Sequence, residues 1–206
     1  MTTPEQAMEL ADELTERAVI YRKTPFELRA GDMSHWYIDL KYGLAAGRIL
    51  LSVGHYMVER ADEEGFEYEA MAGIGTGGWA VVTGVSVALT QLGRGEDVYR
   101  SWAVEHHKVI SQGVDAYGPH APVEGKKIWA LDDTGTTGDS LVTLNNLMKE
   151  FDGTVEHASV VVDRSNGAVA HRLGELGIGF NSLFEFSEET GLLTPTPQTT
   201  PESVVS

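Results

Sequence analysis

Two adjacent carboxylates, Asp132 and Asp133, begin a stretch rich in threonine and glycine that reads DDTGTTGDS over residues 132–140. An apolar run from Ile128 to Leu131 precedes them and predicts a strand buried in a sheet. Apolar residues with a helical period follow and predict a helix over residues 139–151. The sequence therefore predicts a strand, a tight loop and the beginning of a helix.

A loop of this kind suits a phosphate group. The first amides of a helix have no partner within the helix, and the macrodipole places partial positive charge there. Asp132 and Asp133 would repel a phosphate, so we expect them to meet sugar hydroxyls or a Mg²⁺ ion. The alternative is an ordinary strand-to-helix turn capped by an aspartate. A ligand that carries a phosphate beside a ribose fits both halves of the stretch.

Two further predicted strands end in residues that could bind a ligand. Residues 68–74 read as a buried strand followed by Gly75, Thr76 and Gly77, whose amides could receive a second anion; a simple glycine turn is the alternative. Arg164 follows a strand predicted over residues 154–162, and a surface charge is the alternative there. Because ligands of open α/β sheets bind beyond the carboxyl ends of the strands, we expect one site at these ends.

The elements that must position these residues alternate between strand and helix over residues 68–186. This alternation predicts a single α/β domain over residues 1–189 with a central, mainly parallel sheet flanked by helices. A capping box from Thr3 to Gln6 predicts an N-terminal helix. A short strand pair is expected within a small N-terminal hood of roughly residues 20–41.

Two segments carry no clear period. Residues 105–125 are expected to form a loop of about twenty residues, a length that is usually functional or mobile. Residues 190–206, rich in threonine and proline, are expected to form a disordered tail.

Composition limits the function classes. The chain has 206 residues and a formal net charge of −16, which argues against binding nucleic acid and means that an anionic ligand needs local donors and Mg²⁺. No apolar run reaches the roughly 18 residues of a membrane span, and the acidic N-terminus is unlike a signal peptide. Cysteine is absent, which excludes disulfides and thiolate metal sites and fits a cytoplasmic protein.

The central stretch resembles the phosphoribosyl pyrophosphate (PRPP) motif of the type I phosphoribosyltransferases, and no Walker A loop occurs. Further features in the same order resemble the orotate phosphoribosyltransferase family over roughly residues 20–187. The stretch from Phe26 to Gly31 resembles F-x-L-[KR]-[SA]-G and is followed by Tyr37 and Asp39. Residues 74–80 stand where the family has its pyrophosphate loop, and residues 162–164 resemble its D-R pair.

The resemblance implies a role for each matching residue. The residues implied to hold the 5-phosphate are Thr134, Gly135, Thr136, Thr137, Gly138, Asp139 and Ser140. Asp132 and Asp133 would lie beside the ribose hydroxyls. Gly75, Thr76 and Gly77 would face the pyrophosphate. Mg²⁺, the implied cofactor, would be held mainly through PRPP, with Asp132 and Asp133 as candidate ligands. The residues implied to face the base are Arg29, Tyr37, Thr136 and Arg164.

The implied reaction is the Mg²⁺-dependent transfer of phosphoribosyl from PRPP to orotate in pyrimidine nucleotide biosynthesis, and the family is usually homodimeric. The chain departs from the family in the mobile loop, R-K-x-x-K-x-H-G, where it has HHKVISQG over residues 106–113. His106, His107 and Lys108 are therefore the candidate catalytic cations, and a solvated histidine pair is the alternative. The departure leaves two rivals open: a phosphoribosyltransferase for another base, and a non-catalytic sensor of PRPP or a nucleotide.

Overall fold

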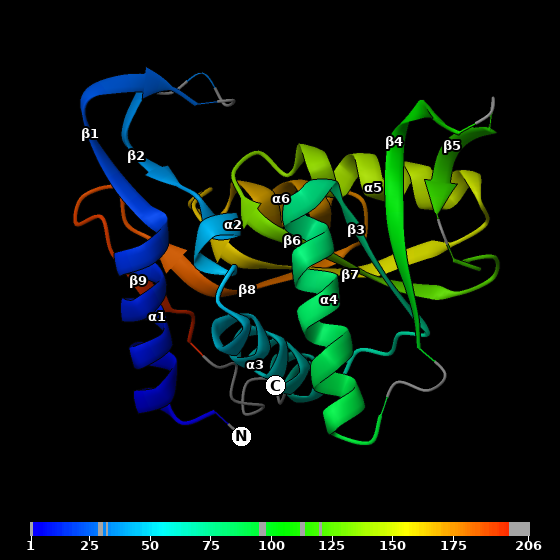
Figure 1. Ribbon diagram of the computed structural model, residues 1–206, viewed down its shortest axis with the longest axis horizontal. Coiled ribbons are helices and arrows are strands. Elements are labelled where there is room, and N and C mark those ends of the chain that lie inside the picture. The colour runs from blue at the N-terminus through cyan, green and yellow to red at the C-terminus, as the bar shows by residue number, and fades with distance from the viewer. Residues whose placement is uncertain are drawn as a thin grey trace, which may run out of the picture.

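The computed structural model describes residues 2–28, 31, 33–94, 98–111, 114–119 and 121–197, with the backbone alone over 101–111 and 114–118. Helices and strands alternate along most of this length (Figure 1). In chain order the elements are α1 (Pro4–Ala18), β1 (Val19–Glu27), β2 (Met33–Ile38), α2 (Leu40–Gly43), α3 (Gly47–Glu64), β3 (Ala70–Ile74), α4 (Gly75–Gln91), β4 (Tyr99–Ser111), β5 (Val114–Pro119), β6 (Lys127–Gly135), α5 (Asp139–Glu150), β7 (Thr154–Asp163), α6 (Ala168–Gly174), β8 (Gly179–Phe186) and β9 (Leu193–Pro195).

Within the described residues, seven strands form the main sheet in the order β5-β4-β3-β6-β7-β8-β9. The five inner strands run parallel, and the two edge strands, β5 and β9, pair antiparallel with their neighbours. The expected α/β fold with a mainly parallel sheet is therefore confirmed.

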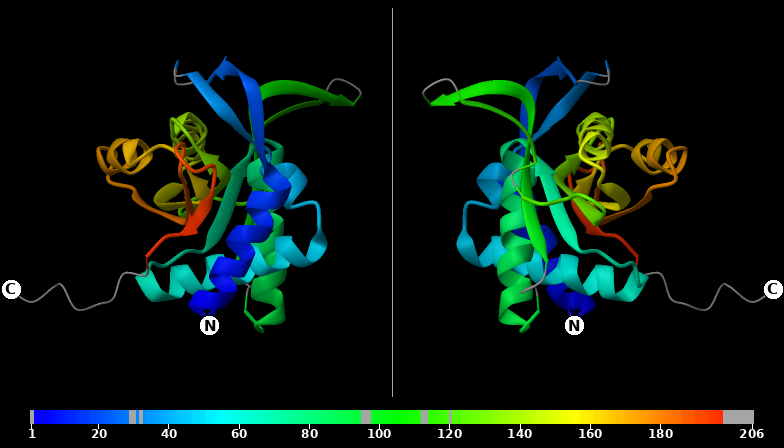
Figure 2. Two further views of the ribbon diagram at one scale, coloured as in Figure 1. Left: turned by 90° about the vertical axis from the view of Figure 1, so that its left-hand side faces the viewer. Right: turned by 90° about the vertical axis from the view of Figure 1, so that its right-hand side faces the viewer.

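Helices cover both faces of the sheet (Figure 2). On one face, side chains of α1, α3 and α4 pack with Trp129 and Leu131 of β6. On the other face, side chains of α5 and α6 pack with Ile128 and Ala130 of the same strand. Because alternate side chains of a strand point to opposite faces, burial on both sides explains why this segment reads as a continuous apolar run.

The N-terminal part agrees with the sequence. The Thr3 hydroxyl accepts a hydrogen bond from the backbone amide of Gln6, and the Gln6 side chain accepts one from the backbone amide of Thr3. These two bonds complete the predicted capping box of α1. Strands β1 and β2 pair antiparallel and form a hairpin separate from the main sheet, in the position of the expected hood. Figures 1 and 2 show this hairpin projecting from the same end of the molecule as β4 and β5.

The expected loop over residues 105–125 is wrong for most of its length. Strand β4 continues to Ser111 and pairs antiparallel with β5, with Val109 opposite Asp115. The ladder of an edge hairpin is made of backbone hydrogen bonds, which require no apolar period in the sequence. Gln112 and Gly113 lie outside the described residues.

The expected disordered tail is wrong for residues 190–197. Leu193 to Pro195 form β9, which pairs with the edge of β8. The Leu193 side chain is buried, and its amide donates to the Thr15 hydroxyl of α1 at 3.1 Å. One apolar side chain and a free sheet edge thus order this segment; residues 198–206 lie outside the described residues. None of the helices in the described part of the chain has both the length and the apolar character needed to cross a membrane.

Candidate active site

The carboxyl ends of β3 and β6 lie side by side, and a helix begins just beyond each. Strand β6 continues to Gly135, so Asp132 and Asp133 belong to the strand and the loop is shorter than predicted. Helix α4 begins at Gly75, so the predicted glycine loop is the first helical turn. Gly138, the residue before α5, has φ 75°, a left-handed conformation that favours glycine.

A cavity of about 290 Å³ opens at these ends. Its lining comes from the ends of β3 and β6 and the beginnings of α4 and α5: Lys41, Ile74, Gly75, Gly77, Asp132, Asp133, Thr134, Gly135, Thr136, Thr137, Gly138, Asp139, Ser140 and Leu141. The structure thus brings together all the residues expected to hold PRPP except Thr76, which is exposed beside the cavity. Two helix N-termini face one space, which favours an anionic ligand.

Asp133 lies against the first turn of α4. A Cβ atom on Gly77 would clash with all three atoms of the Asp133 carboxylate, so a larger residue there would force this carboxylate to move. The glycine therefore brings a carboxylate and the α4 amides to one wall of the cavity.

Asp132 is more deeply buried, with 7% of its surface exposed. Its Oδ1 accepts the Asp133 amide at 2.9 Å. Burial, and then the charge of the neighbouring Asp133, raise the pKa of Asp132 well above its usual range. A cation or hydroxyl donors in the cavity would stabilise the ionised form of this carboxyl.

The two carboxylates suit a hard divalent cation in chemistry and in number. Among the described residues no cluster of three or more histidine or acidic side chains could hold a metal alone. Mg²⁺ commonly takes one or two protein carboxylates and completes its shell with water and substrate phosphates. The residues present fit an ion of that kind that arrives with a phosphorylated ligand.

Arg172 of α6 supports the connection between β6 and α5, a contact that sequence reasoning missed. Its guanidinium donates to the Thr137 carbonyl at 2.7 Å and to Asp139 Oδ1 at 2.6 Å. The Thr137 hydroxyl donates to Asp139 Oδ2 at 2.7 Å. Arg172 therefore offsets the charge of Asp139 at the wall of the cavity. No motif marks this arginine, which comes from a different helix.

Lys41 was also missed. Helix α2 follows the β1–β2 hairpin and brings the Lys41 ammonium to the cavity, 3.6 Å from Asp39 Oδ1. Among the described residues that line the cavity, Lys41 is the cation. The sequence signal was weak, because the lysine lies two positions after Asp39, the last residue that follows the matched pattern, and does not belong to that pattern.

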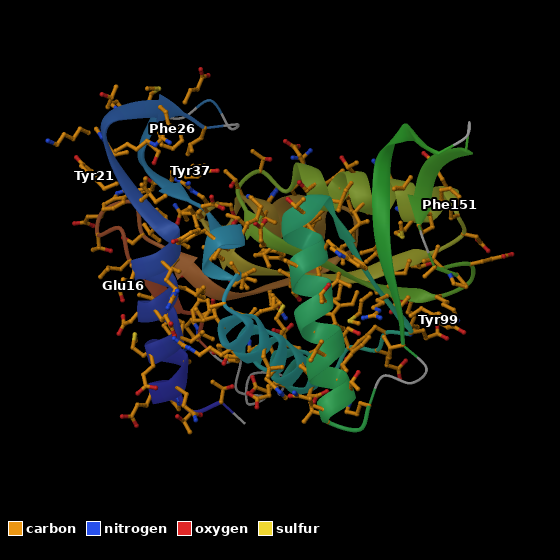
Figure 3. The ribbon with its side chains drawn as sticks, viewed as in Figure 1. Glu16, Tyr21, Phe26, Tyr37, Tyr99 and Phe151 are labelled. Atoms are coloured by element: carbon orange, nitrogen blue, oxygen red, sulfur yellow. The ribbon has the colours of Figure 1, made fainter. Side chains whose placement is uncertain are left out.

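The residues expected to face the base are dispersed. Thr136 lines the cavity, but Arg29 lies outside the described residues. Tyr37 packs edge-on against Phe26 on the β1–β2 hairpin, with ring centroids 6.1 Å apart (Figure 3). Because neighbouring residues of a strand point to opposite faces, Tyr37 faces away from the side of β2 that carries Trp36.

The backbone of Arg164 adjoins the cavity, but its side chain points away from the cavity. Its amide donates to the carbonyl of Gly135, a lining residue, at 2.9 Å. Its guanidinium reaches β2, where it donates to the Trp36 carbonyl at 3.3 Å, and it pairs with Glu188. The side chains of His106, His107 and Lys108 lie outside the described residues; their backbone belongs to β4.

Known proteins resemble this chain in sequence and fold, although no protein-family model matches it. The orotate phosphoribosyltransferase of Sulfolobus acidocaldarius is 30% identical over 163 residues, 79% of this chain and 76% of that protein. The crystal structure of Mycobacterium tuberculosis orotate phosphoribosyltransferase in complex with PRPP has a TM-score of 0.66 at 22% identity, covering 91% of this chain and 93% of that chain. Adenine phosphoribosyltransferase from Thermoanaerobacter pseudethanolicus has a TM-score of 0.57 at 14% identity, covering 85% and 99%. Proteins named for different bases share the fold, so the fold alone does not select a base.

Proposed function

The chain belongs to the orotate phosphoribosyltransferase family, and from this membership we infer that it transfers the phosphoribosyl group of PRPP to orotate. The products are orotidine 5′-phosphate and pyrophosphate. The observation that carries the inference is that two helix N-termini and two adjacent carboxylates line the same cavity. This combination matches a ligand with phosphates at both ends of a ribose.

In the proposed reaction, the bond from the anomeric carbon to the pyrophosphate oxygen breaks and a bond to a ring nitrogen of the base forms. The backbone and hydroxyls of residues 134–140 hold the 5-phosphate, and Asp132 and Asp133 lie beside the ribose. The amides at Gly75 and Gly77 face the pyrophosphate. Holding both reactants in line and stabilising the charge of the departing pyrophosphate are the protein's main contributions.

Mg²⁺ is part of the proposal. Asp132 and Asp133 are the protein's candidate ligands for the ion, which would be held mainly through PRPP and would supply positive charge near the leaving pyrophosphate. We also propose a homodimer, as the family resemblance implies. In such a dimer the segment that carries His106 and His107 reaches the partner's site.

A second candidate remains because of one sequence feature. Arg and Lys of the family's mobile loop are replaced by His106 and His107, so the leaving group has fewer permanent cations. A protein that binds PRPP without turnover, or one that uses another base, would agree with this change.

Two measurements test the proposal. A calorimetric titration with PRPP should show binding that strengthens when Mg²⁺ is added. A steady-state assay with orotate, uracil and adenine should then show turnover with orotate above the other two. Tight PRPP binding without turnover of any base would favour the non-catalytic sensor. Turnover with a different base would indicate a phosphoribosyltransferase for that base.

A further inference from the structure

Arg164 already has a carboxylate partner inside the protein. Its guanidinium pairs with Glu188, on the connection between β8 and β9, and the Arg164 side chain is only 4% exposed. The other Glu188 oxygen, Oε2, accepts the Ser34 hydroxyl of β2 at 2.9 Å. The Arg164 guanidinium also lies 5.3 Å from the centre of the Phe186 ring. An ion pair with one partner this deeply buried differs from an ordinary surface pair, which contributes little.

The segment that carries Glu188 is held in place by Trp36. The Trp36 indole N–H donates to the Glu188 carbonyl at 3.0 Å. The indole ring covers Gly191 so closely that a Cβ atom there would clash with it. Trp36 also packs edge-on against Phe186, with ring centroids 6.3 Å apart. Glu188 is therefore positioned by several independent contacts, and its pairing with Arg164 is part of the fold.

This pairing leaves the guanidinium incompletely satisfied. Arg164 Nε is buried and has no hydrogen-bond partner among the described residues. The terminal nitrogens donate to the Trp36 carbonyl and the Ser34 hydroxyl, both at 3.3 Å, and to Glu188. A guanidinium presents a planar fork that can take a carboxylate through two parallel hydrogen bonds. Glu188 occupies one arm of this fork and leaves another donor unused.

The location links the pair to the reaction. The Arg164 amide donates to the carbonyl of Gly135, which lines the cavity, so the residue begins at the wall of the proposed PRPP site. Orotate differs from uracil by one carboxylate. Arginine is the natural partner for a carboxylate, and here an internal carboxylate pairs with the guanidinium of a residue whose backbone adjoins the site.

We propose that Glu188 is an internal substitute for the carboxylate of the base, and that an acidic base must displace it from Arg164 in order to bind. The proposal rests on the function inferred above. It makes Glu188 a specificity-determining residue. Glu188 weakens the binding of a carboxylated base, leaves a neutral base unaffected, and so reduces the discrimination between the two.

The test compares two nucleotides that differ only in this carboxylate. Dissociation constants of orotidine 5′-phosphate and uridine 5′-phosphate are measured by calorimetry for the wild type, Glu188→Gln and Glu189→Gln. The neighbouring Glu189 is exposed, so its variant is a control with the same change in charge. Glu188→Gln should bind orotidine 5′-phosphate about tenfold more tightly, the size of one gained charge-assisted hydrogen bond, with uridine 5′-phosphate unchanged. Glu189→Gln should change neither.

The affinity for uridine 5′-phosphate and the thermal midpoint report whether each variant is folded. If Glu188→Gln fails to fold, Glu188→Asp is the second variant, because it keeps the charge on a shorter side chain. It should also tighten the binding of orotidine 5′-phosphate and leave that of uridine 5′-phosphate unchanged. Equal effects on both nucleotides, or weaker binding of orotidine 5′-phosphate alone, would overturn the role of Glu188 and leave the proposed function standing. If no variant bound either nucleotide, the proposed function and this inference would both be wrong.

Discussion

Asp132 and Asp133 are neighbours in the sequence, but their side chains lie in different surroundings. Asp133 lies partly exposed against the first turn of α4. Asp132 is almost fully buried, and its pKa is raised by burial and by the charge of Asp133. We therefore expect that Asp132, which is proposed to bind the ligand, destabilises the empty protein.

We predict that Asp132→Asn makes the protein more stable and much less active. Because the folded-state pKa is raised, the folded protein retains a proton that the unfolded chain releases, so stability falls as pH rises above about 4. At neutral pH the neutral amide removes this cost, and the thermal midpoint should rise by roughly 2–4 °C for each kcal/mol gained. The rate of transfer should fall by about 10²-fold or more.

Thermal unfolding and a transfer assay at pH 7 measure both effects. Asp12→Asn, on the exposed surface of α1, removes the same formal charge and should change neither quantity. A lower midpoint for Asp132→Asn would show that this carboxyl stabilises the fold.

The β4–β5 hairpin places residues that the sequence assigned to a loop. The backbone of His106, His107 and Lys108 belongs to β4, and the pairing of β4 with β5 shifts register between Val104 and Lys108. The position of these residues in a strand was not predicted from the sequence.

We predict that catalysis weakens as pH rises through the histidine range. An unperturbed histidine has a pKa of about 6.5, so its charge beside the leaving pyrophosphate is largely lost by about pH 8. His106→Arg combined with His107→Lys should flatten the profile of kcat between about pH 6 and 9, at saturating Mg²⁺. His171→Arg, on the exposed surface of α6, is the control and should leave the profile unchanged. Identical profiles for the wild type and the double variant would show that His106 and His107 take no part.

His157, near the beginning of β7, lies between the end of α3 and the sheet. Its ring stacks on Phe66 with centroids 3.8 Å apart, and Nε2 lies 3.4 Å from Glu64 Oε2. Burial lowers the pKa of His157 to about 4, which means that desolvation outweighs the attraction of the nearby carboxylate. The structure therefore holds this histidine in its neutral form.

We predict that His157 contributes to acid unfolding. Between about pH 6.5 and 4 the unfolded chain binds a proton that the folded protein excludes, so stability falls as pH falls through this window. The loss should reach at most about 3 kcal/mol, since one pKa unit corresponds to about 1.4 kcal/mol. Urea unfolding at several pH values should show a smaller loss for His157→Asn than for the wild type. His171→Asn, with an exposed side chain, should follow the wild type, and a parallel curve for His157→Asn would refute the prediction.

The whole molecule carries a formal net charge of −16 and is proposed to bind an anion. The anion is attracted by a small region, where two helix N-termini, Arg172 and Lys41 lie near the cavity. Repulsion comes from the rest of the surface and acts over longer distances. The Debye length falls from about 30 Å at 0.01 M salt to about 10 Å at 0.1 M, so salt weakens the long-range repulsion more than the short contacts.

We predict that kcat/KM for PRPP rises by about twofold or more when ionic strength increases from about 0.01 to 0.1 M. Free Mg²⁺ must be kept constant, because salt also changes metal binding to PRPP. Two different monovalent salts should give the same curve if screening is the cause. A steady fall of kcat/KM with salt would mean that local cations govern the encounter.

The sequence by itself determined the elements whose causes are local. The α1 capping box depends on residues three apart, and the apolar run of residues 128–131 with the glycine and threonine after it specifies a strand, a turn and a helix start. Alternation of such units then determined the mainly parallel sheet, because a parallel pair needs a crossover connection. These properties follow from near neighbours along the chain, so they could be predicted without coordinates.

Only the tertiary structure decided which distant groups meet. Ser34 and Glu188 are separated by 154 positions, and Arg172 lies 33 positions from Asp139. The β5 and β9 edges form through backbone hydrogen bonds that leave no period in the sequence. Arg164 was predicted to face the base, and packing pairs its guanidinium with Glu188, a contact that the sequence does not reveal. A charge near the end of a strand shows which chemistry is available, but its partner depends on how the whole chain packs.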